Sequence, residues 1–562
     1  MHGLMMDFEL TIPALIRRAE RLHPRKLIVS RQPDRSLHHT TYGDVIHRAR
    51  KLAGALRALG IEPGDRVATF CWNHSRHLEA YYAVPCMGAV LHTLNLRLFP
   101  DDLAYIAAHA GDKVVLVDRV LWPVFETFRD RVPFEHVVVL GDGQSPGDGT
   151  IAGAIDYESL IASAPEHDFD VVRDERTAAA MCYTSGTTGQ PKGVVYSHRS
   201  TVLHSLCMAL ADIDLVRETD TVCAMVPMFH ANAWGSPYAA AMVGANQVLP
   251  GPHLDPVSLV ELLQSERVTV GLGVPTIWNA VLQLLEKCPG IYDLSRLRAT
   301  AAGGSAVPEA MIRAMDRHGI PMVQLWGMTE TSPVGTSARL SDDLAHADED
   351  TRYRYRAKQG RPVPLVEARV RADDGIAPWD DETMGELEVR GPWVVGEYYN
   401  APASSDRFTG DGWFRTGDIA TIDPDGWITI RDRSKDVIKS GGEWISSVAL
   451  ENTLMAHPSV AEAMVIGLPH PQWDERPLAL VVRREGVECR PDDLVAHLAP
   501  HFPKWWLPTA FEFVQSLPRT SVGKFDKKVA RREYADYFAS ADPSLPPSPP
   551  STPARNSSTA AL

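Results

Sequence analysis

The segment Tyr183–Gly193 reads YTSGTTGQPKG and guides the interpretation of the whole chain. Its three glycines permit positive φ angles and let the backbone approach a ligand closely. Its hydroxyl groups and its lysine supply the hydrogen-bond donors and the positive charge that a triphosphate needs. Apolar residues flank the segment on both sides, which favours a phosphate-binding loop over a flexible surface turn. The candidate ligand-binding residues of the loop are Thr184, Ser185, Gly186, Thr187, Thr188 and Lys192.

This loop differs from the loop of P-loop nucleotidases. That class has the pattern GxxxxGK[ST], in which a hydroxyl residue directly follows the lysine and binds magnesium. Here Gly193 follows Lys192, so the magnesium-binding hydroxyl is missing from that place. The sequence therefore disfavours a P-loop nucleotidase.

Outside the loop, short apolar runs alternate with helical patterns. Val114–Val117, Val137–Leu140 and Val268–Val274 are rich in β-branched residues and apolar on both faces, as buried parallel strands are. Tyr42–Leu59 has apolar residues at helical spacing and stops at Gly60. This alternation predicts an α/β fold in which helices cover mainly parallel sheets.

The pattern of apolar and polar residues changes after about residue 385. Glu386–Arg390 and Trp427–Arg431 alternate like half-exposed strands. We expect a large N-terminal domain over residues 1–431 and a small mobile α+β domain over residues 432–540, with a hinge near Asp432. Residues 541–562 are rich in proline and serine and predict a disordered tail.

Composition limits the classes of function. Of 562 residues, 44% are hydrophobic and 23% charged, which is typical of a globular protein. The 56 Lys and Arg against 71 Asp and Glu give a net charge of −15, which disfavours general binding to nucleic acid. The seven cysteines form no CxxC pair, and no run of about 18 apolar residues occurs. We expect a cytoplasmic enzyme without a transmembrane segment and without a nucleic-acid partner.

Five further motifs follow the loop in a recognisable order. They are GGSA at 303–306, QLWGMTET at 324–331, WFRTGD at 413–418, DRSKDVIKSGGEWIS at 432–446 and PRTSVGKF at 518–525. With the loop, they resemble the motifs of the adenylate-forming superfamily, which includes acyl-CoA synthetases, adenylation domains of peptide synthetases and luciferases. The resemblance covers roughly residues 30–530 and implies that a carboxylic acid is joined to AMP.

The resemblance assigns a nucleotide site. It implies that Glu330 holds Mg²⁺ together with the Thr184 hydroxyl, and that Thr329 donates to the α-phosphate. Asp418, assisted by Arg433, would accept hydrogen bonds from the ribose hydroxyls. Trp326 would stack on adenine, although the superfamily more often has tyrosine there. The other residues implied to line the ATP or AMP site are Gly304, Ser305, Gln324, Gly327 and Met328.

The resemblance also implies two half-reactions that share one cavity. Lys524 would stabilise the charge that grows in the first step. Rotation about Asp432 would then bring Gly441 and Gly442 towards the site for transfer to coenzyme A. The resemblance further places Lys435, Lys439 and Trp444 at phosphate or adenine in one orientation. Two alternatives stay open from the residues alone: Lys524 could belong to a solvated basic helix face with Lys527, Lys528, Arg531 and Arg532, and Lys435 and Lys439 could be a solvated i,i+4 pair.

The run VPMFHANAWG at 226–235 bears on the substrate. It resembles the segment of fatty acyl-CoA synthetases in which a tryptophan, here Trp234, gates an acyl tunnel and a histidine, here His230, lies near the reacting carboxylate. Gly235 and Gly303 would complete the acyl site. Amino-acid-activating domains would be expected to supply an aspartate near residue 231, and none is present. An apolar acid is therefore favoured.

The sequence thus predicts an acid–thiol ligase of fatty acid metabolism that uses ATP, Mg²⁺ and coenzyme A. A medium- or long-chain fatty acid is the expected substrate. The alternatives are a 3-methylmercaptopropionyl-CoA ligase or another short or aryl acid ligase, an enzyme that loads a carrier-protein thiol, and a silent nucleotide-binding regulatory protein. By family analogy the protein could form a homodimer.

Overall fold

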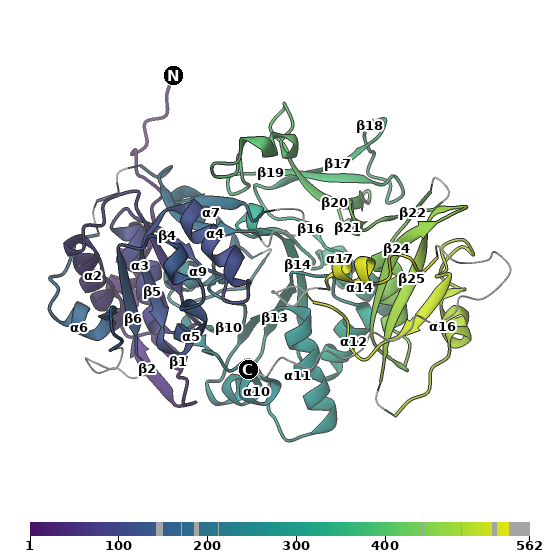
Figure 1. The fold of residues 1–562 in the computed structure, drawn as a ribbon, viewed down its shortest axis with the longest axis horizontal. Coiled ribbons are helices and arrows are strands. Elements are labelled where there is room, and N and C mark those ends of the chain that lie inside the picture. The colour runs from purple at the N-terminus through teal and green to yellow at the C-terminus, as the bar shows by residue number, and fades with distance from the viewer. Residues whose placement is uncertain are drawn as a thin grey trace. The chain divides into compact units, whose positions relative to one another are not determined.

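The computed structural model describes residues 1–141, 150–169, 171–172, 174–184, 190–211, 213–440, 443–484, 486–519 and 525–538, without the side chains of residues 403, 405 and 443. The chain divides into two compact units (Figure 1). The first unit comprises Met1–Thr416 and Thr421–Thr429, and the second comprises Gly417–Ala420 and Ile430–Leu562. The expected hinge residue, Asp432, is close to the start of the second unit at Ile430. The predicted tail, residues 541–562, lies outside the described residues.

A nine-stranded sheet forms one half of the first unit, and its strands from β14 to β1 are parallel. The order is β16 (Arg361–Pro362), β15 (Val334–Ser337), β14 (Met322–Gly327), β13 (Ala299–Gly303), β12 (Val270–Gly273), β10 (Thr221–Ala224), β11 (Asn246–Leu249), β1 (Leu27–Arg31) and β2 (Leu37–Thr41).

A seven-stranded sheet forms the other half, and all its strands except β9 are parallel. The order is β7 (Ile155–Asp156), β6 (His136–Leu140), β5 (Asp112–Asp118), β3 (Arg66–Phe70), β4 (Val90–Thr93), β8 (Ala178–Tyr183) and β9 (Gly193–Ser197). Three of the strands predicted from apolar runs are confirmed as β5, β6 and β12.

Helices cover these sheets, so the predicted α/β class is confirmed. The helix expected over Tyr42–Leu59 is α2 (Tyr42–Ala58), and Gly60 follows its end with a φ of +87°. The other helices of at least eight residues in this unit are α1 (Ile12–Leu22), α3 (Ser75–Cys86), α4 (Pro100–Ala110), α7 (His198–Ala209), α9 (Ser236–Val243), α10 (Pro256–Ser265), α11 (Pro275–Lys287), α12 (Glu309–Arg317) and α14 (Glu349–Arg356). Shorter segments are α5 (Trp122–Phe125), α6 (Tyr157–Ala162), α8 (Ala231–Trp234) and α13 (Asp342–Ala345).

The cores lie between these layers. One cluster packs α10, α11 and α12 against the nine-stranded sheet through buried residues such as Leu262, Trp278 and Met315. Figure 1 shows these helices beside β13 and β14. A second cluster packs α4 and α5 on the seven-stranded sheet through Leu103, Phe125 and Val117.

A five-stranded sheet follows in the order β18 (Gly375–Ile376), β17 (Glu367–Ala372), β19 (Gly385–Arg390), β20 (Phe414–Ile422) and β21 (Ile428–Arg433), and the boundary between the two units passes through β20 and β21. The second unit has its own sheet in the order β23 (Glu443–Ile445), β22 (Ile438–Ser440), β25 (Asp474–Arg483) and β24 (Val460–His470), with β26 (Ala510–Phe513) pairing with β25. Its helices are α15 (Ser447–Met455), α16 (Pro491–Leu498) and α17 (Lys527–Glu533).

Two expectations about the whole chain can be compared with this structure. All seven cysteines are free thiols, as the scattered spacing predicts. Within the described ranges, no helix combines the length and the apolar character that crossing a bilayer requires.

Candidate active site

The base of the predicted phosphate loop is a hairpin. β8 and β9 run antiparallel, and Tyr183 lies opposite Gly193. The Thr184 amide donates to the Lys192 carbonyl at 3.0 Å, and the Lys192 amide donates to the Thr184 hydroxyl oxygen at 3.1 Å. These two bonds close the loop below residues 185–189. Ser185, Gly186, Thr187 and Thr188 lie outside the described residues.

A tyrosine joins the lysine of this loop to the predicted metal ligand. The Lys192 ammonium lies 4.9 Å from the centre of the Tyr398 ring. The Tyr398 hydroxyl donates to Glu330 Oε1 at 2.7 Å. Burial, together with the negative charge of Glu330, raises the pKa of Tyr398, so the phenol remains a donor at neutral pH. Motif reasoning missed Tyr398, since nothing in the string GEYYN at 396–400 distinguishes it.

Glu330 is a buried carboxylate without a cationic partner. The residue is 6% exposed, and among the described residues no Lys, Arg or His nitrogen lies within 4.0 Å of its carboxylate. An isolated buried charge is unfavourable unless it is paired or binds a metal ion. The absence of a cationic partner within the described ranges therefore favours binding of a cation by Glu330.

Backbone contacts fix Glu330 in this place. It lies in the short 3-10 helix η3 (Thr329–Thr331). The Val395 amide donates to the Glu330 carbonyl at 2.8 Å, and the Tyr196 hydroxyl of β9 donates to the Thr329 carbonyl at 2.7 Å. The Tyr399 amide donates to the Gly193 carbonyl at 2.9 Å. The segment 395–399 thus ties the loop hairpin to η3.

The predicted adenine-side residues fall into two groups. Gly304 and Ser305 are exposed at the end of β13, where a ligand could reach them. Gln324 is 1% exposed, and its side chain is used within the protein: the amide oxygen accepts from the Val307 amide at 2.6 Å and the amide nitrogen donates to the Lys358 carbonyl at 2.8 Å. The Gln324 side chain thus holds the chain just after the turn at 303–306, and a contact of Gln324 with the nucleotide stays a prediction.

Trp326 is 8% exposed and packs on the neighbouring strand β15. The Trp326 ring lies 2.6 Å from the point where a Cβ on Gly335 would be. Any residue other than glycine at position 335 would therefore force the ring to shift. Gly327 and Met328 are partly exposed and lead directly into η3.

The predicted acyl-side residues lie on a backbone of unusual handedness. Residues 231, 232, 233 and 234 have φ angles of +43°, +50°, +47° and +57°, and Gly235 follows at +72°. The left-handed conformation costs about 1–2 kcal/mol for each L-residue that has a Cβ. The segment α8 is therefore a strained left-handed turn, which the sequence did not predict.

The left-handed turn directs Trp234 onto β13. The Trp234 ring lies 3.3 Å from the point where a Cβ on Gly303 would be. The structure therefore brings Trp234 and Gly303 together, with half-buried His230 at the beginning of the turn.

Buried polar side chains hold the turn. Asn232 Oδ1 accepts from the Cys182 thiol at 3.2 Å and from the Tyr81 hydroxyl at 3.3 Å. Cys182 belongs to β8, the strand that leads into the phosphate loop. Asn73 fixes the approach to the turn, because its amide donates to the carbonyls of Ala224 and Val226 at 2.9 Å.

The second unit holds the predicted ribose ligands. Arg433 Nε lies 2.7 Å from Asp418 Oδ1, and the Asp418 side chain is 2% exposed. The structure thus places these two predicted residues next to each other.

The predicted hinge residue belongs to a buried charged network in this unit. Asp432 accepts from the Ser447 amide at 2.6 Å and from the Ser447 hydroxyl at 2.5 Å. Lys527 donates to the same hydroxyl at 2.5 Å and lies 2.7 Å from Glu451 Oε1. The Lys527 side chain is 10% exposed, so its assignment to a solvated basic face is wrong. We call Asp432, Ser447, Lys527 and Glu451 the hinge cluster.

Lys435, Lys439 and Trp444 lie outside helices. Lys435 is exposed in a turn, and Lys439 is exposed on β22 opposite Trp444 of β23. The exposure of both lysines agrees with the alternative of a solvated pair, and their contacts with a nucleotide stay a prediction. Gly441, Gly442 and Lys524 lie outside the described residues.

Comparisons with known proteins agree with this arrangement. The AMP-binding enzyme family matches residues 16–399, and the AMP-binding enzyme C-terminal domain matches residues 449–524. The long-chain-fatty-acid–CoA ligase of Thermus thermophilus is 49% identical over 96% of this chain and 98% of that protein. The 3-methylmercaptopropionyl-CoA ligase of Ruegeria lacuscaerulensis is 45% identical over 95% of this chain and 99% of that protein. The solved structure of ATP-bound MatB from Rhodopseudomonas palustris has 27% identity and a TM-score of 0.81, covering 94% of this chain and all of that one.

Proposed function

This chain belongs to the AMP-binding enzyme family, and from that premise we propose that it is an ATP-dependent acyl-CoA synthetase. In the first step a fatty acid carboxylate attacks the α-phosphorus of ATP, which gives acyl-AMP and pyrophosphate. In the second step the thiol of coenzyme A attacks the acyl carbon, and AMP leaves. A medium- or long-chain acid is the proposed substrate.

The observation that carries the proposal is the buried Glu330 carboxylate beside the base of the phosphate loop. Oxygen ligands are the ones Mg²⁺ prefers, and Glu330 and the Thr184 hydroxyl would hold it. A bound Mg²⁺ would neutralise charge on the phosphates. Lys192, held over the Tyr398 ring, adds a second positive charge for the same anion. The first step needs this neutralisation, because the carboxylate and the triphosphate are both anions.

The same proposal assigns roles to the other residues of the nucleotide site. Thr329 would donate to the α-phosphate, and Trp326, Gly327, Met328, Gly304 and Ser305 would surround adenine. Asp418 would accept from the ribose hydroxyls, with Arg433 holding its carboxylate.

For the residues of the second unit we keep the predicted division of labour. Lys524 would serve the first step. Gly441, Gly442 and Trp444 would serve the thiol-transfer step after rotation about Asp432, with Lys435 and Lys439 as further phosphate contacts. A rotating domain lets one cavity serve two reactions in turn.

The acyl side favours an uncharged tail. Trp234, Gly235 and Gly303 would line the acyl channel, and His230 would lie near the carboxylate. The relative from Thermus thermophilus is named for long-chain fatty acids, which agrees with this proposal. The second candidate is a short thioether acid, because the relative from Ruegeria lacuscaerulensis is named for 3-methylmercaptopropionate.

The test is pyrophosphate release across acetate, butyrate, 3-methylmercaptopropionate, octanoate, palmitate and an aryl acid, with and without coenzyme A. We expect release to be fastest with octanoate or palmitate, and release of AMP to require coenzyme A. Fastest turnover with 3-methylmercaptopropionate would select the second candidate. ATP binding without release from any acid would indicate a silent nucleotide-binding protein.

Lys524→Ala is the control within this experiment. It should abolish acyl-AMP formation and still convert supplied acyl-AMP and coenzyme A to acyl-CoA. Equal loss of both steps would contradict the division of labour. A cytoplasmic location and a homodimer remain predictions, to be checked by fractionation and by light scattering.

A further inference from the structure

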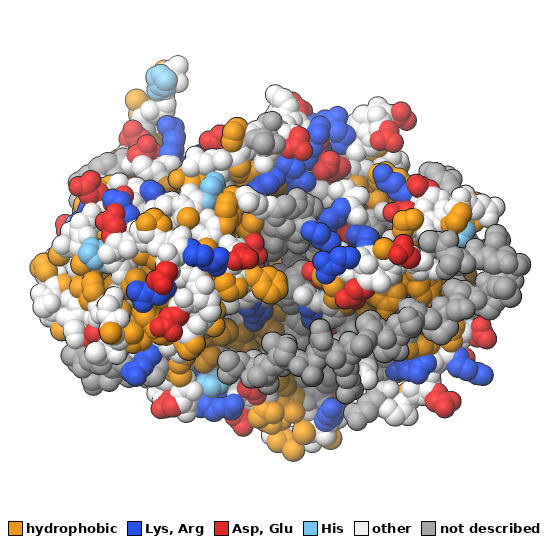
Figure 2. All heavy atoms as spheres, viewed as in Figure 1, with side chains coloured by type: hydrophobic (Ala, Val, Ile, Leu, Met, Phe, Trp, Pro, Cys, Tyr) orange, Lys and Arg blue, Asp and Glu red, His pale blue; other side chains and the backbone are white. Residues whose placement is uncertain are grey.

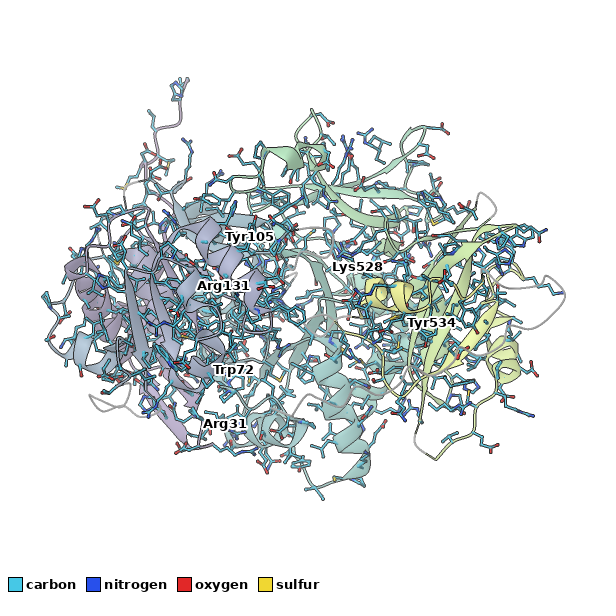
Figure 3. All side chains as sticks on the ribbon, in the orientation of Figure 1. Arg31, Trp72, Tyr105, Arg131, Lys528 and Tyr534 are labelled. Atoms are coloured by element: carbon cyan, nitrogen blue, oxygen red, sulfur yellow. The ribbon has the colours of Figure 1, made fainter. Side chains whose placement is uncertain are left out.

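A small pocket lies in the first unit, away from the phosphate loop. Its cavity volume is about 20 Å³, a little above the roughly 10–15 Å³ that one water molecule needs, so the pocket suits a small ion and not an extended ligand. Its lining includes Arg31, Trp72, His74, Arg76, Asp118 and Arg119. Figure 3 labels Arg31 and Trp72. We call it the Arg31 pocket.

The Arg31 pocket lies where parallel strands end. Arg31 closes β1, Trp72 follows β3, and Asp118 closes β5. The chain leaves β3 for β4 on one side, and it leaves β5 for β6 on the other side. In open parallel sheets, ligands bind outside the carboxyl ends of the strands at such a switch point. The switch point lies between β5 and β3. The phosphate loop instead follows β8, and β4 lies between β8 and β3, so the two sites are separate.

The decisive residue of the pocket is Arg31. The residue is 8% exposed, and within the described part of the chain Nη1 donates a hydrogen bond to the Ser258 carbonyl at 2.5 Å. Its Nε has no hydrogen-bond partner, and within the part of the chain that the structure describes no carboxylate oxygen lies within 4.0 Å of the guanidinium. A buried cation without a counter-ion is unfavourable, and an anion in the pocket would relieve that cost.

The surrounding charges strengthen the argument. The lining contains Arg31, Arg76 and Arg119 with one carboxylate, Asp118, and Arg76 also lies 3.9 Å from Glu158 Oε1. Asp118 is already engaged, because it accepts from the Trp72 amide at 2.8 Å and lies 2.8 Å from His74 Nε2. The protein as a whole carries a net charge of −15, and on the face in Figure 2 both signs are interspersed. A positive pocket on an acidic protein selects an anion by charge.

A metal ion explains the pocket less well. Cys71, His74 and Asp118 lie close enough together to hold one. However, His74 Nδ1 accepts from the His77 amide at 3.1 Å while Nε2 contacts Asp118, so both ring nitrogens are used. Burial raises the pKa of Cys71, which keeps the thiol protonated. The ligand atoms of these side chains are therefore already hydrogen-bonded or protonated, which disfavours a metal ion.

We propose that the Arg31 pocket binds a phosphate-type oxyanion at a site separate from the nucleotide site. Guanidinium groups suit phosphate oxygens, because their N–H donors match them in pairs. The oxyanion could be a free phosphate or a phosphate group on a larger molecule, and the half-buried Trp72 ring at the mouth offers a face to such a molecule.

The experiment titrates inorganic phosphate into the full chain by calorimetry, with saturating AMP present to occupy the proposed nucleotide site. Parallel titrations use pyrophosphate and adenosine 3′,5′-bisphosphate. We expect one saturable phosphate site that Arg31→Met weakens at least about tenfold. Arg119→Met, at the exposed rim, should weaken it about threefold, because a contact in water contributes less.

Arg35→Met is the matched control. Arg35 lies four residues further on, its side chain is 61% exposed and its partner is Asp255. It should bind phosphate like the parent protein. Binding of bisphosphate but not of free phosphate, lost in Arg31→Met, would assign the pocket to a phosphate group on a larger molecule.

Equal binding by the parent, Arg31→Met and Arg119→Met would overturn the proposal, as would no saturable binding of any of the three anions. If Arg31→Met does not fold, Arg119→Met decides. A second measurement supports it: phosphate should raise the unfolding temperature of the parent more than that of Arg31→Met, because its general salt effect is the same for both proteins. An equal rise in both proteins would count against the site.

Discussion

Two buried charges of the first unit differ from the hinge cluster of the second. Glu330 and Arg31 are 6% and 8% exposed, and among the described residues neither has an ion-pair partner. In the hinge cluster, the carboxylates of Asp432 and Glu451 lie around the ammonium of Lys527. Other buried carboxylates of the first unit are paired in the same way, as Glu79 and Glu158 are with Arg48. Since a buried charge needs an opposite charge, the two unpaired residues point to ligands and the paired ones to the stability of the fold.

The largest effect should come from breaking the internal neutralisation. Lys527→Met removes the cation and leaves two buried carboxylates, so we expect α15 and α17 to lose about 3–5 kcal/mol of stability. Native-state hydrogen exchange of these helices measures the loss. The control is Lys528→Met, because this neighbour is exposed (Figure 3). Equal protection in both variants would mean that the hinge cluster contributes nothing.

The next effect concerns the unpaired carboxylate of the first unit. Glu330→Gln removes the charge that would hold Mg²⁺, and we expect acyl-AMP formation to fall about 10²–10³-fold. Stability should change little, because no internal cation depends on Glu330. A large fall in the unfolding temperature with normal turnover would reverse the assignment and make Glu330 a structural residue.

A neutral region sharpens the comparison, because the left-handed turn is held without charges. Asn232→Ala removes the hydrogen bonds to Cys182 and Tyr81. It also leaves an alanine at a φ of +50° with no side-chain hydrogen bonds to hold that conformation. We expect the free energy of unfolding to fall by about 1–3 kcal/mol. Asn232→Gly should lose less, because glycine adopts positive φ freely. Thermal unfolding gives the order, and the KM for the acid should rise while the KM for ATP does not. Ala233→Gly, in the same turn, is the control.

The smallest effect is a pH dependence of the hinge cluster. Burial raises the pKa of Glu451 from its ordinary value of 4.5 to about 7, although Lys527 acts to lower it. The folded state therefore holds a proton that the unfolded state has released, so stability falls as pH rises from about 4.5 to about 7 and then levels off. Hydrogen exchange of α15 at several pH values, corrected for intrinsic rates, follows this change. In Glu451→Gln the slope over this range should shrink; an unchanged slope would assign it to another group.

Much of the fold could be predicted, because the signals are local. Runs such as Val114–Val117 become buried strands since β-branched residues pack well between helices. The glycine at 60 ends its helix as expected. The helices α13 and α14 were not predicted, because their polar sequences give little sign of a buried face.

The site was predictable only where chemistry follows a motif. Glu330, Lys192 and the pair Asp418–Arg433 were found this way. Tyr398 and Lys527 were missed because their roles depend on partners 68 and 76 residues away, which no spacing encodes. The left-handed turn was missed for another reason: the string ANAW is compatible with a right-handed helix, and only the buried partners of Asn232 select the opposite hand.

The handedness of that turn also constrains how the sequence can drift. Valine, isoleucine and threonine are poorly tolerated at positions 231–233, because branching at Cβ makes positive φ still less favourable. Glycine and asparagine are the substitutions this backbone admits most readily. The facing position is constrained as well, because a methyl group added at Gly303 would lie 2.8 Å from the Leu325 carbonyl oxygen and 3.3 Å from the Trp234 ring. Both sides of this contact therefore resist substitution.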